Sequence, residues 1–353
     1  EYNTGLDASF LKGKLRFTVD VYQKYIKDLL QKKVKMPTSI GYGNGYEVSY
    51  MNSGKMTNKG WEFRVDAVPF ENRDWRVGFY FNIAHNENKI TEMPDNYTEE
   101  NYTFNNGEYA YRREEGRPMG SFYGYRYKGV CQNKDATYAR DADGNVMKDI
   151  SGNAIVMRNG TATIAPGDAL YEDINHDGVI NQYDIVYLGN SNPRFTGGAG
   201  VNVSYKQFKL SAIFYGRYGQ DVVNSTRLNN ESMRGIDNQS TAVLRRWRNE
   251  GDQTDIPRAL YGEGYNTLGS DRFVEDASYL RLKSLSFNYR LPKKIIQRWG
   301  FSNIDVYVTG YNLFTWTKYT GQDPEVKTEN TYARDSATTP ASIQLVAGFN
   351  LSF

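Results

Sequence analysis

The sequence predicts an all-β protein, and specifically a transmembrane antiparallel β-barrel, on three observations. Apolar and polar residues alternate with a period of two in many short segments, which is typical of strands with one apolar face. Aromatic residues make up 14% of the chain, and such residues form girdles at the two interfaces of membrane barrels. Short turns alternate with long segments rich in Gly, Asn, Asp and Tyr, which matches the short periplasmic turns and long external loops of outer-membrane barrels.

The composition excludes several other classes of protein. Lys and Arg number 43 against 41 Asp and Glu, so the net charge of +2 gives no field that would favour nucleic acid. A single cysteine allows no internal disulfide, and the two histidines lack the spacing of a zinc site. No segment has the roughly 20 consecutive apolar residues of a membrane helix, and the first residues do not resemble a signal peptide. Membrane-spanning strands of about 10 alternating residues remain possible, because they are compatible with the low mean hydropathy of the chain.

Each spanning strand is predicted from its alternation, taken in chain order. Phe79 and Phe81, for example, alternate with Tyr80 and Asn82, so that apolar and polar side chains point to opposite faces. The helical signal is weak except at 241–249 and 292–299. The same pattern places about nine spanning strands along the chain, at 4–12, 14–25, 59–70, 74–88, 194–205, 207–216, 278–290, 303–314 and 342–353.

The connections between these strands differ greatly in length. The predicted short turns lie at 12–14, 71–74 and 206–207, and the predicted external loops are 26–58, 91–193, 217–276 and 315–341. If all short turns lie at one end, the aromatic run 122–127 is part of a long external excursion and not a tenth spanning strand. An odd number of strands cannot close a bacterial barrel, which has an even number. The sequence therefore predicts the carboxyl-terminal part of a larger barrel, and the alternative is a complete barrel of about ten strands.

A calcium-type loop is predicted at 173–184. The segment matches the pattern D-x-[DN]-x-[DN]-G with an acidic residue at the twelfth position, in which oxygen ligands at alternate positions surround a hard cation. The twelfth residue is Asp184 in place of the usual Glu, and its shorter side chain should weaken the site. The alternative is an Asn/Asp/Gly turn that binds no ion. The predicted ligands of a structural Ca²⁺ are Asp173, Asn175, Asp177, the carbonyl of Val179, Asn181 directly or through water, and Asp184.

Tyrosines in the longest excursion are candidates for binding substrate. Tyr109, Tyr111, Tyr123 and Tyr125 have Asn and Arg neighbours in the sequence, a combination suited to stacking on sugar rings or binding a peptide. The alternative is that their rings pack the loop against a plug or a neighbouring subunit. No catalytic set is evident, since neither histidine lies in a nucleophile motif and no G-x-S-x-G occurs. We therefore expect no enzymatic activity.

Six short segments occur together in an order that a known family also shows. They are 58–62 (NKGWE), 167–168 (GD) leading into 173–178 (DINHDG), 188–190 (LGN) with Pro193, 280–283 (LRLK), 311–315 (YNLFT) and 319–325 (YTGQDPE). In these segments, which extend over nearly the whole chain, the sequence resembles the SusC/RagA family of TonB-dependent outer-membrane transporters.

This resemblance implies a plugged barrel of about 22 strands in the outer membrane of a Gram-negative bacterium, with the polar strand face toward the lumen and the apolar face toward lipid. It also implies active import of an oligosaccharide or peptide, driven by the TonB complex and assisted by a SusD-like surface lipoprotein, with a dimer of transporter–lipoprotein pairs as one assembly. The plug domain and the TonB-contacting segment have no counterpart in this sequence, so energy coupling cannot be assigned to any residue here. The alternatives are a surface adhesin or a calcium-stabilised ligand-binding barrel without active transport.

Overall fold

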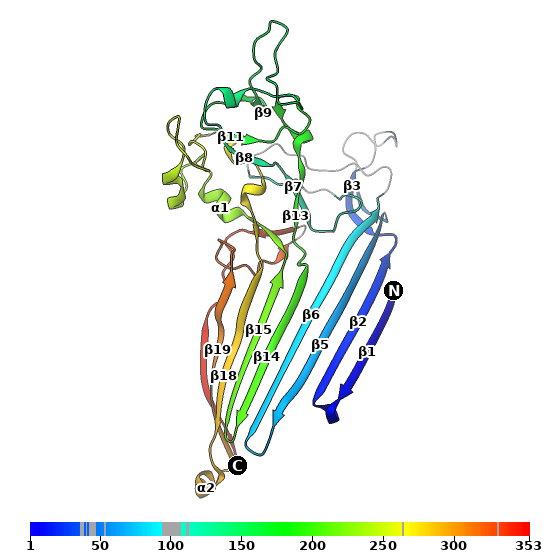
Figure 1. Cartoon of the computed structure of the whole chain (residues 1–353), viewed down its shortest axis with the longest axis vertical. Coiled ribbons are helices and arrows are strands. Elements are labelled where there is room, and N and C mark those ends of the chain that lie inside the picture. The colour runs from blue at the N-terminus through cyan, green and yellow to red at the C-terminus, as the bar shows by residue number, and fades with distance from the viewer. Residues whose placement is uncertain are drawn as a thin grey trace.

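Nine long strands form one antiparallel sheet, in which the strand order follows the sequence (Figure 1). The computed structural model describes residues 1–35, 39, 41, 47–52, 54–93, 107–110, 113–262, 265–329 and 332–353. Strands β1 and β22 form the two edges of the sheet. The nine strands are β1 (Tyr2–Phe10), β2 (Leu15–Ile26), β5 (Lys55–Glu71), β6 (Trp75–Glu92), β14 (Phe195–Tyr205), β15 (Phe208–Tyr218), β18 (Tyr279–Arg290), β19 (Asn303–Thr317) and β22 (Gln344–Ser352).

These nine strands confirm the nine that the alternation predicts. The principal differences are that β5 and β6 begin or end a few residues further toward the external loops, and that β19 extends to Thr317. Strand β7 (Ser121–Gly124) pairs with β13 (Val186–Asn190) outside the large sheet, so the aromatic run does not form a tenth spanning strand. The predicted helical segments contain η5 (Thr241–Arg245), and α2 (Lys293–Ile296) followed by η8 (Gln297–Trp299).

The short and long connections lie at opposite ends of the sheet (Figure 1). At the end with the short connections, η1 (Leu11–Gly13) joins β1 to β2, and α2 with η8 joins β18 to β19. Gly300 ends η8 with φ of 79°, a left-handed conformation that glycine adopts without the steric cost of a Cβ. At the opposite end, the connection between β2 and β5 contains the hairpin of β3 (Leu30–Lys35) and β4 (Glu47–Asn52).

The excursions fold into small sheets above the large one, and we call the described residues of 107–193 and 219–277 the cap. Its core contains Tyr123, Tyr125, Cys131, Tyr171 and Leu268, all nearly inaccessible to solvent. The remaining strands are β8 (Tyr127–Val130), β9 (Arg158–Asn159), β10 (Ala162–Thr163), β11 (Ala169–Tyr171), β12 (Val179–Ile180), β16 (Asp221–Asn224), β17 (Val274–Asp276), β20 (Thr328–Glu329) and β21 (Tyr332–Asp335). The remaining helices are η3 (Asp135–Thr137), η4 (Gln182–Asp184), α1 (Ser225–Asn230), η6 (Tyr265–Thr267) and η7 (Asp271–Phe273).

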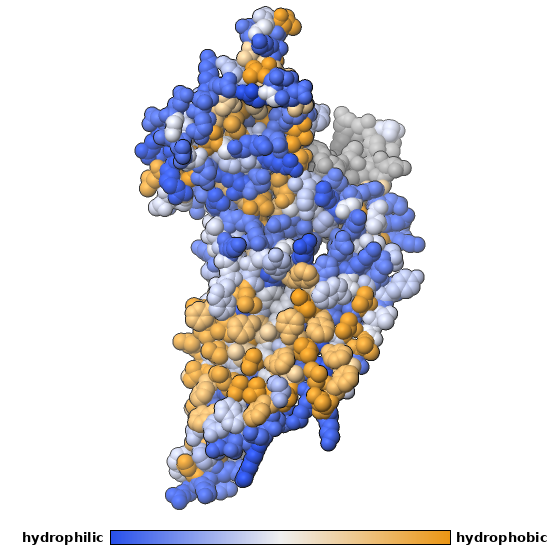
Figure 2. Space-filling view, in the orientation of Figure 1, coloured by the Kyte–Doolittle hydropathy of each residue, from blue (hydrophilic) through white to orange (hydrophobic). Residues whose placement is uncertain are grey.

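The large sheet has one apolar and one polar face because residues paired directly across strands point to the same side. Val77 pairs with Val203, Val203 with Leu210, and Leu210 with Phe287, which gives one continuous apolar row. Figure 2 shows a broad hydrophobic band across the sheet, and Leu210 and Phe287 are among the large apolar residues that are exposed. No helix among the described residues has the length and apolar character needed to cross a membrane.

Candidate functional site

The polar face of the sheet presents charged and hydrogen-bonding side chains over several strands. Arg64 on β5 donates two hydrogen bonds of 2.7 Å to Asp66, and its guanidinium lies 5.3 Å from the centre of the Tyr80 ring on β6. These groups, together with Arg16, Arg76, Asn202, Ser204 and Lys209, surround a hollow of about 710 Å³ on this face. The hollow is suited to a polar ligand or to water, because the exposed groups offer both donors and acceptors.

At the other end of the polar face, a buried arginine connects β18 to the loop that follows β19. Arg281 is only 2% exposed, and it donates hydrogen bonds to Asp323 at 2.5 Å, to Glu325 at 2.8 Å and to Thr315 at 2.8 Å. Lys283 donates to the same Glu325 carboxylate at 2.8 Å. We call Arg281, Lys283, Asp323 and Glu325 the latch, since these four side chains hold an external loop against the top of the sheet.

The cap is joined to the same loop by a second set of polar contacts. Glu275 on β17 accepts a hydrogen bond of 2.9 Å from the amide of Thr320, and its carboxylate pairs with Arg227 at 3.2 Å. Within the loop itself, the hydroxyl of Tyr319 donates to Asp335 at 2.7 Å, and burial raises the pKa of Tyr319 far above its ordinary value. The loop after β19 is therefore held from below by the latch and from the side by the cap.

The predicted substrate-binding tyrosines lie mainly inside the cap. Tyr109 is 7% exposed and donates to the carbonyl of Ser270 at 2.7 Å, while Tyr123 and Tyr125 are 0% and 1% exposed. Their rings pack against other cap residues, so within this chain they do not reach a ligand-accessible surface. The rings thus pack within this chain, whereas the alternative predicts that they pack the loop against a plug or a neighbouring subunit. Tyr111 lies outside the described residues, and a binding role for the four tyrosines stays a prediction.

The predicted calcium loop has the backbone conformation of a tight oxygen-lined turn. The side chain of Asp173 accepts from the amide of Gly178 at 2.7 Å, and that of Asp177 accepts from Val179 at 2.8 Å. Gly178 has φ of 81°, as the sharp turn requires. Asn181 caps η4, and its amide Nδ2 donates to the carbonyl of Val179 at 3.0 Å. The five residues thus lie on one closed turn, in the order that the sequence pattern predicts.

Asp184 closes this turn from the inside. Its side chain is fully buried, and its carboxylate oxygens accept from the amides of Ile174 and Asn181, both at 2.8 Å. Burial raises the pKa of Asp184, and the negative charges of Asp173 and Asp177 act in the same direction. Within the described residues, no group of three or more His, Cys, Asp or Glu side chains is arranged to hold a metal ion. A cation here would therefore also need amide and carbonyl oxygens as ligands.

The sequence reasoning missed the latch, although both of its segments were among those that resembled the family. The segments 280–283 and 319–325 contain charges of opposite sign, which was an available signal for their pairing. More than 40 residues separate Arg281 from its acidic partners, and the local pattern does not show that the chain brings them together.

Comparisons with known proteins agree with this architecture. No protein-family profile matches the chain. The chain is 31% identical to TonB-dependent receptor P3 of Formosa agariphila over 94% of this chain and 31% of that receptor. It is 26% identical to TonB-dependent receptor SusC of Bacteroides thetaiotaomicron over 100% of this chain and 31% of that receptor. The solved structure of the RagAB peptide transporter superposes with a TM-score of 0.71 and 27% identity, covering 99% of this chain and 35% of that one. The chain thus spans about a third of the length of these relatives.

Proposed function

Because this chain belongs to the SusC/RagA-like TonB-dependent receptors of the Gram-negative outer membrane, we propose that it forms part of the barrel of an active importer. The nine strands would be neighbouring strands in the wall of a plugged barrel of about 22 strands. The observation that carries the proposal is the two-faced sheet, with an apolar outer band and a charged inner face below the cap. Strands β1 and β22 each pair on one side only within the described sheet, and further strands of the barrel would pair with their free sides.

The proposed cargo is an oligosaccharide, with a peptide as the second candidate. Exposed hydroxyl, amide and charged groups on the polar face suit either ligand, since both carry many donors and acceptors. The peptide candidate is favoured by the similarity to RagAB, which is described as a peptide transporter. We further propose that a SusD-like surface lipoprotein covers the external loops, that TonB supplies the energy, and that two such pairs can form a dimer.

The test is uptake by cells that carry the full-length receptor. Labelled oligosaccharides and labelled oligopeptides are offered separately to cells with and without a functional TonB complex. We expect uptake of one ligand class that disappears when TonB is absent. Surface binding that persists at full strength without TonB, and without internalisation, would instead support the adhesin alternative. Co-purification of the receptor with a lipoprotein encoded beside it tests the proposed partner.

A substitution on the polar face should separate transport from stability. Arg64→Ser removes a charge that faces the proposed lumen, so we expect uptake to fall several-fold. The Arg64–Asp66 pair is about half exposed, and exposed pairs contribute only about 0–1 kcal/mol, so the barrel should remain folded. Arg298→Ser, which removes an exposed charge at the short-turn end, is the matched control. Equal uptake by both variants would argue against Arg64 lining the transport path.

We also propose that the loop 173–184 holds a structural Ca²⁺. The ligands would be the side-chain oxygens of Asp173, Asn175, Asp177 and Asp184 with the carbonyl of Val179, and Asn181 directly or through water. The proposal is supported by the position of Asp184 beside the negative charges of Asp173 and Asp177, which a divalent cation would offset. When bound, the cation would fix the external loop without taking part in transport.

The measurement for calcium is hydrogen exchange in the full-length receptor, followed in peptides that cover 173–184. Removing Ca²⁺ with a chelator should speed exchange at the amides of Gly178 and Val179, and re-addition should reverse the change. Asp173→Asn, which changes the first position of the pattern, should abolish this response. The control is Asp143→Asn, the same change in an exposed turn of the cap. Chelator-independent exchange in the unmodified receptor would mean that the loop is a turn without an ion.

A further inference from the structure

The cap contains a small cavity between its two excursions. The cavity has a volume of about 410 Å³, which is within the range of small-molecule sites. One wall is the hairpin of β9 and β10, and the opposite wall contains Arg258, Leu260 and Tyr265 from the excursion 219–277. Figure 1 shows β9 in the part of the cap that is remote from the large sheet. The cavity is therefore separate from the polar face of the sheet, where the proposed transport path lies.

Asn159 is held firmly at the wall of this cavity. Its strand, β9, has neighbours on both sides, and Asn159 pairs with Ala162 on β10 and with Ile180 on β12. Gly160 begins the turn to β10 with φ of 59°, a conformation that glycine adopts without steric cost. Directly paired residues point to the same side of a sheet, so Ala162 lies beside the Asn159 side chain, and both residues line the cavity.

The amide group of Asn159 has an unused hydrogen-bonding capacity. The residue is 2% exposed, and its Oδ1 is buried without a hydrogen-bond partner among the described residues. A buried polar atom that stays unpaired is costly, so such atoms are nearly always bonded to protein, to water or to a ligand. Asn159 thus offers the cavity a free acceptor, with the donor Nδ2 on the same planar group.

The floor of the cavity carries two charges that neutralise each other. Asp168 is 5% exposed and accepts hydrogen bonds from Nε of Arg258 at 2.7 Å and from Nη2 at 3.2 Å. Nδ2 of Asn266 donates to Asp168 at 3.2 Å and to the carbonyl of Arg258 at 3.1 Å, which fixes the pair. The other residues that line the cavity are uncharged. The cavity as a whole is therefore neutral and suits a neutral ligand.

These features favour the end of a saccharide over the end of a peptide. A hydroxyl both donates and accepts, so two adjacent hydroxyls of a sugar match Oδ1 and Nδ2 of Asn159. The apolar parts of Ala162, Leu260 and Tyr265 would contact the C–H groups of the sugar ring. The end of a peptide instead carries a charged amino or carboxyl group at neutral pH, and the paired charges of this cavity do not offset it.

We propose that the cavity binds the neutral terminal sugar of an oligosaccharide, with adjacent hydroxyls of the sugar bonded to the amide of Asn159. The purpose of this binding, the capture of cargo before import, rests on the function proposed above. The site would hold the ligand at the outer part of the cap, before the ligand reaches the polar face of the sheet.

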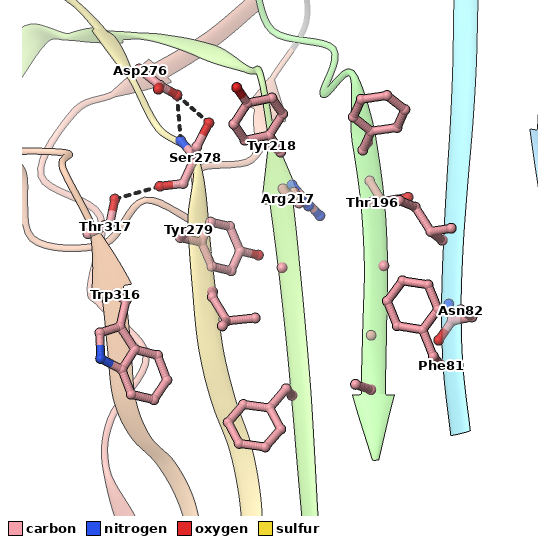
Figure 3. A pocket seen from close by; sticks show the side chains of 18 of the residues that line it. Phe81, Asn82, Thr196, Arg217, Tyr218, Asp276, Ser278, Tyr279, Trp316 and Thr317 are labelled. Carbon is pink, nitrogen blue, oxygen red and sulfur yellow. Dashed lines mark hydrogen bonds between the residues drawn. The ribbon is translucent and has the colours of Figure 1, made fainter. Parts of the chain in front are cut away.

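Another aromatic hollow, of about 650 Å³, lies on the apolar face of the sheet (Figure 3). Phe195 and Tyr218 stack there with ring centres 6.4 Å apart, and with Trp316 they form an aromatic girdle at the external end of the apolar band. Aromatic rings can stack on sugars, but these rings face lipid in the proposed barrel. Trp316→Ala is therefore a control for stacking outside the cap.

The experiment is hydrogen exchange in the purified full-length receptor, followed in peptides that cover 158–164. The probes are methyl glucoside, methyl galactoside, methyl mannoside and triglycine, each titrated to millimolar concentration. We expect at least one glycoside to slow exchange in a saturable manner, and triglycine to have no effect. Protection by none of the glycosides would overturn the site. Stronger protection by triglycine than by every glycoside would overturn the assignment to a saccharide.

Asn159→Leu tests the role of the amide directly. It removes the donor and acceptor at similar volume, so glycoside binding should weaken about tenfold or more. Stability should not fall, because Oδ1 of Asn159 makes no hydrogen bond among the described residues. Asn249→Leu, the same change at an exposed position of the cap outside the cavity lining, and Trp316→Ala should both leave binding unchanged.

A second variant keeps the site testable if Asn159→Leu does not fold. Ala162→Phe places a ring in the cavity from the paired strand and should also weaken glycoside binding about tenfold or more. Unchanged glycoside binding by either folded variant would overturn the site.

Uptake separates this inference from the proposed function. TonB-dependent uptake of an oligosaccharide, without protection of 158–164 by any glycoside, would overturn the site and leave the import proposal standing. Glycoside protection that is lost in Asn159→Leu, in a receptor without TonB-dependent uptake, would support the site and overturn its purpose in import.

Discussion

Replacing Arg281 by methionine is expected to destabilise the receptor by about 3 kcal/mol. This is the lower end of the range for breaking a buried ion pair, because the change leaves two partly buried carboxylates without their cation. The Arg281 side chain is 3% exposed and Asp323 is 15% exposed, so water can replace little of the lost interaction. Methionine retains much of the arginine's apolar length, which limits the contribution of a cavity. The loop after β19 should detach from the sheet before the sheet itself unfolds.

The measurement is unfolding in lipid bilayers together with limited proteolysis of residues 318–329. Lys283→Met is the matched control, since Lys283 is 32% exposed and contacts only the Glu325 side of the latch. It should cost less than Arg281→Met, and cleavage of the loop should accelerate less. If the two variants behave alike in both assays, the latch does not depend on the buried guanidinium.

The latch should also weaken in strong acid. Burial alone would raise the pKa of Asp323, but hydrogen bonds from the amides of Ala341 and Glu325 and from the guanidinium of Arg281 lower it below its ordinary value of 3.8. A carboxyl whose pKa is lowered by folding stabilises the folded form above its unfolded pKa and loses this contribution as the pH falls through the lower, folded value. Cleavage of the loop should therefore be independent of pH at neutral values and accelerate only below pH 3.8. Acceleration already near neutral pH would contradict this role for Asp323.

The spanning strands could be predicted because their signal is local. A period of two over about ten residues reports directly which face of a strand meets lipid, and β6 and β14 repeat it without interruption. The cap carries no such signal, because its strands are short and irregular. Strand β12, for example, contains only Val179 and Ile180 and pairs in parallel with β9. Its position depends on the folding of the loop around it.

The candidate site residues differ in the same way: those in a local turn could be predicted from the sequence, and those whose burial depends on distant residues could not. The turn at 173–184 was predictable because most of its side-chain hydrogen bonds join residues that are close together in the sequence. The burial of Tyr123 was not predictable, because its ring packs in a core that includes Leu268 from the excursion 219–277. The sequence showed that this excursion was aromatic, but only the fold shows that the rings face inward.

The orientation of the sheet in the membrane gives the last prediction. Trp75 and Tyr205 pack with ring centres 4.3 Å apart near the short turns, and Trp316 lies in the girdle at the opposite end. About 9–11 tilted residues cross the hydrocarbon, so Phe79 on β6 lies near its middle. Phe79→Arg should then cost about 2–4 kcal/mol, because it exposes a charge to lipid.

Tyr80→Arg is the matched substitution one residue further along the same strand. Tyr80 lies on the polar face, where its ring covers Gly200 and contacts the Arg64 guanidinium. Losing the cation–π contact at an exposed site costs about 0.5–1 kcal/mol, and water in the lumen would solvate the new charge. Unfolding titrations in bilayers should therefore separate the two variants by about 1–3.5 kcal/mol. Equal costs would mean that both faces meet the same solvent, which is incompatible with a water-filled lumen on one side of this sheet and lipid on the other.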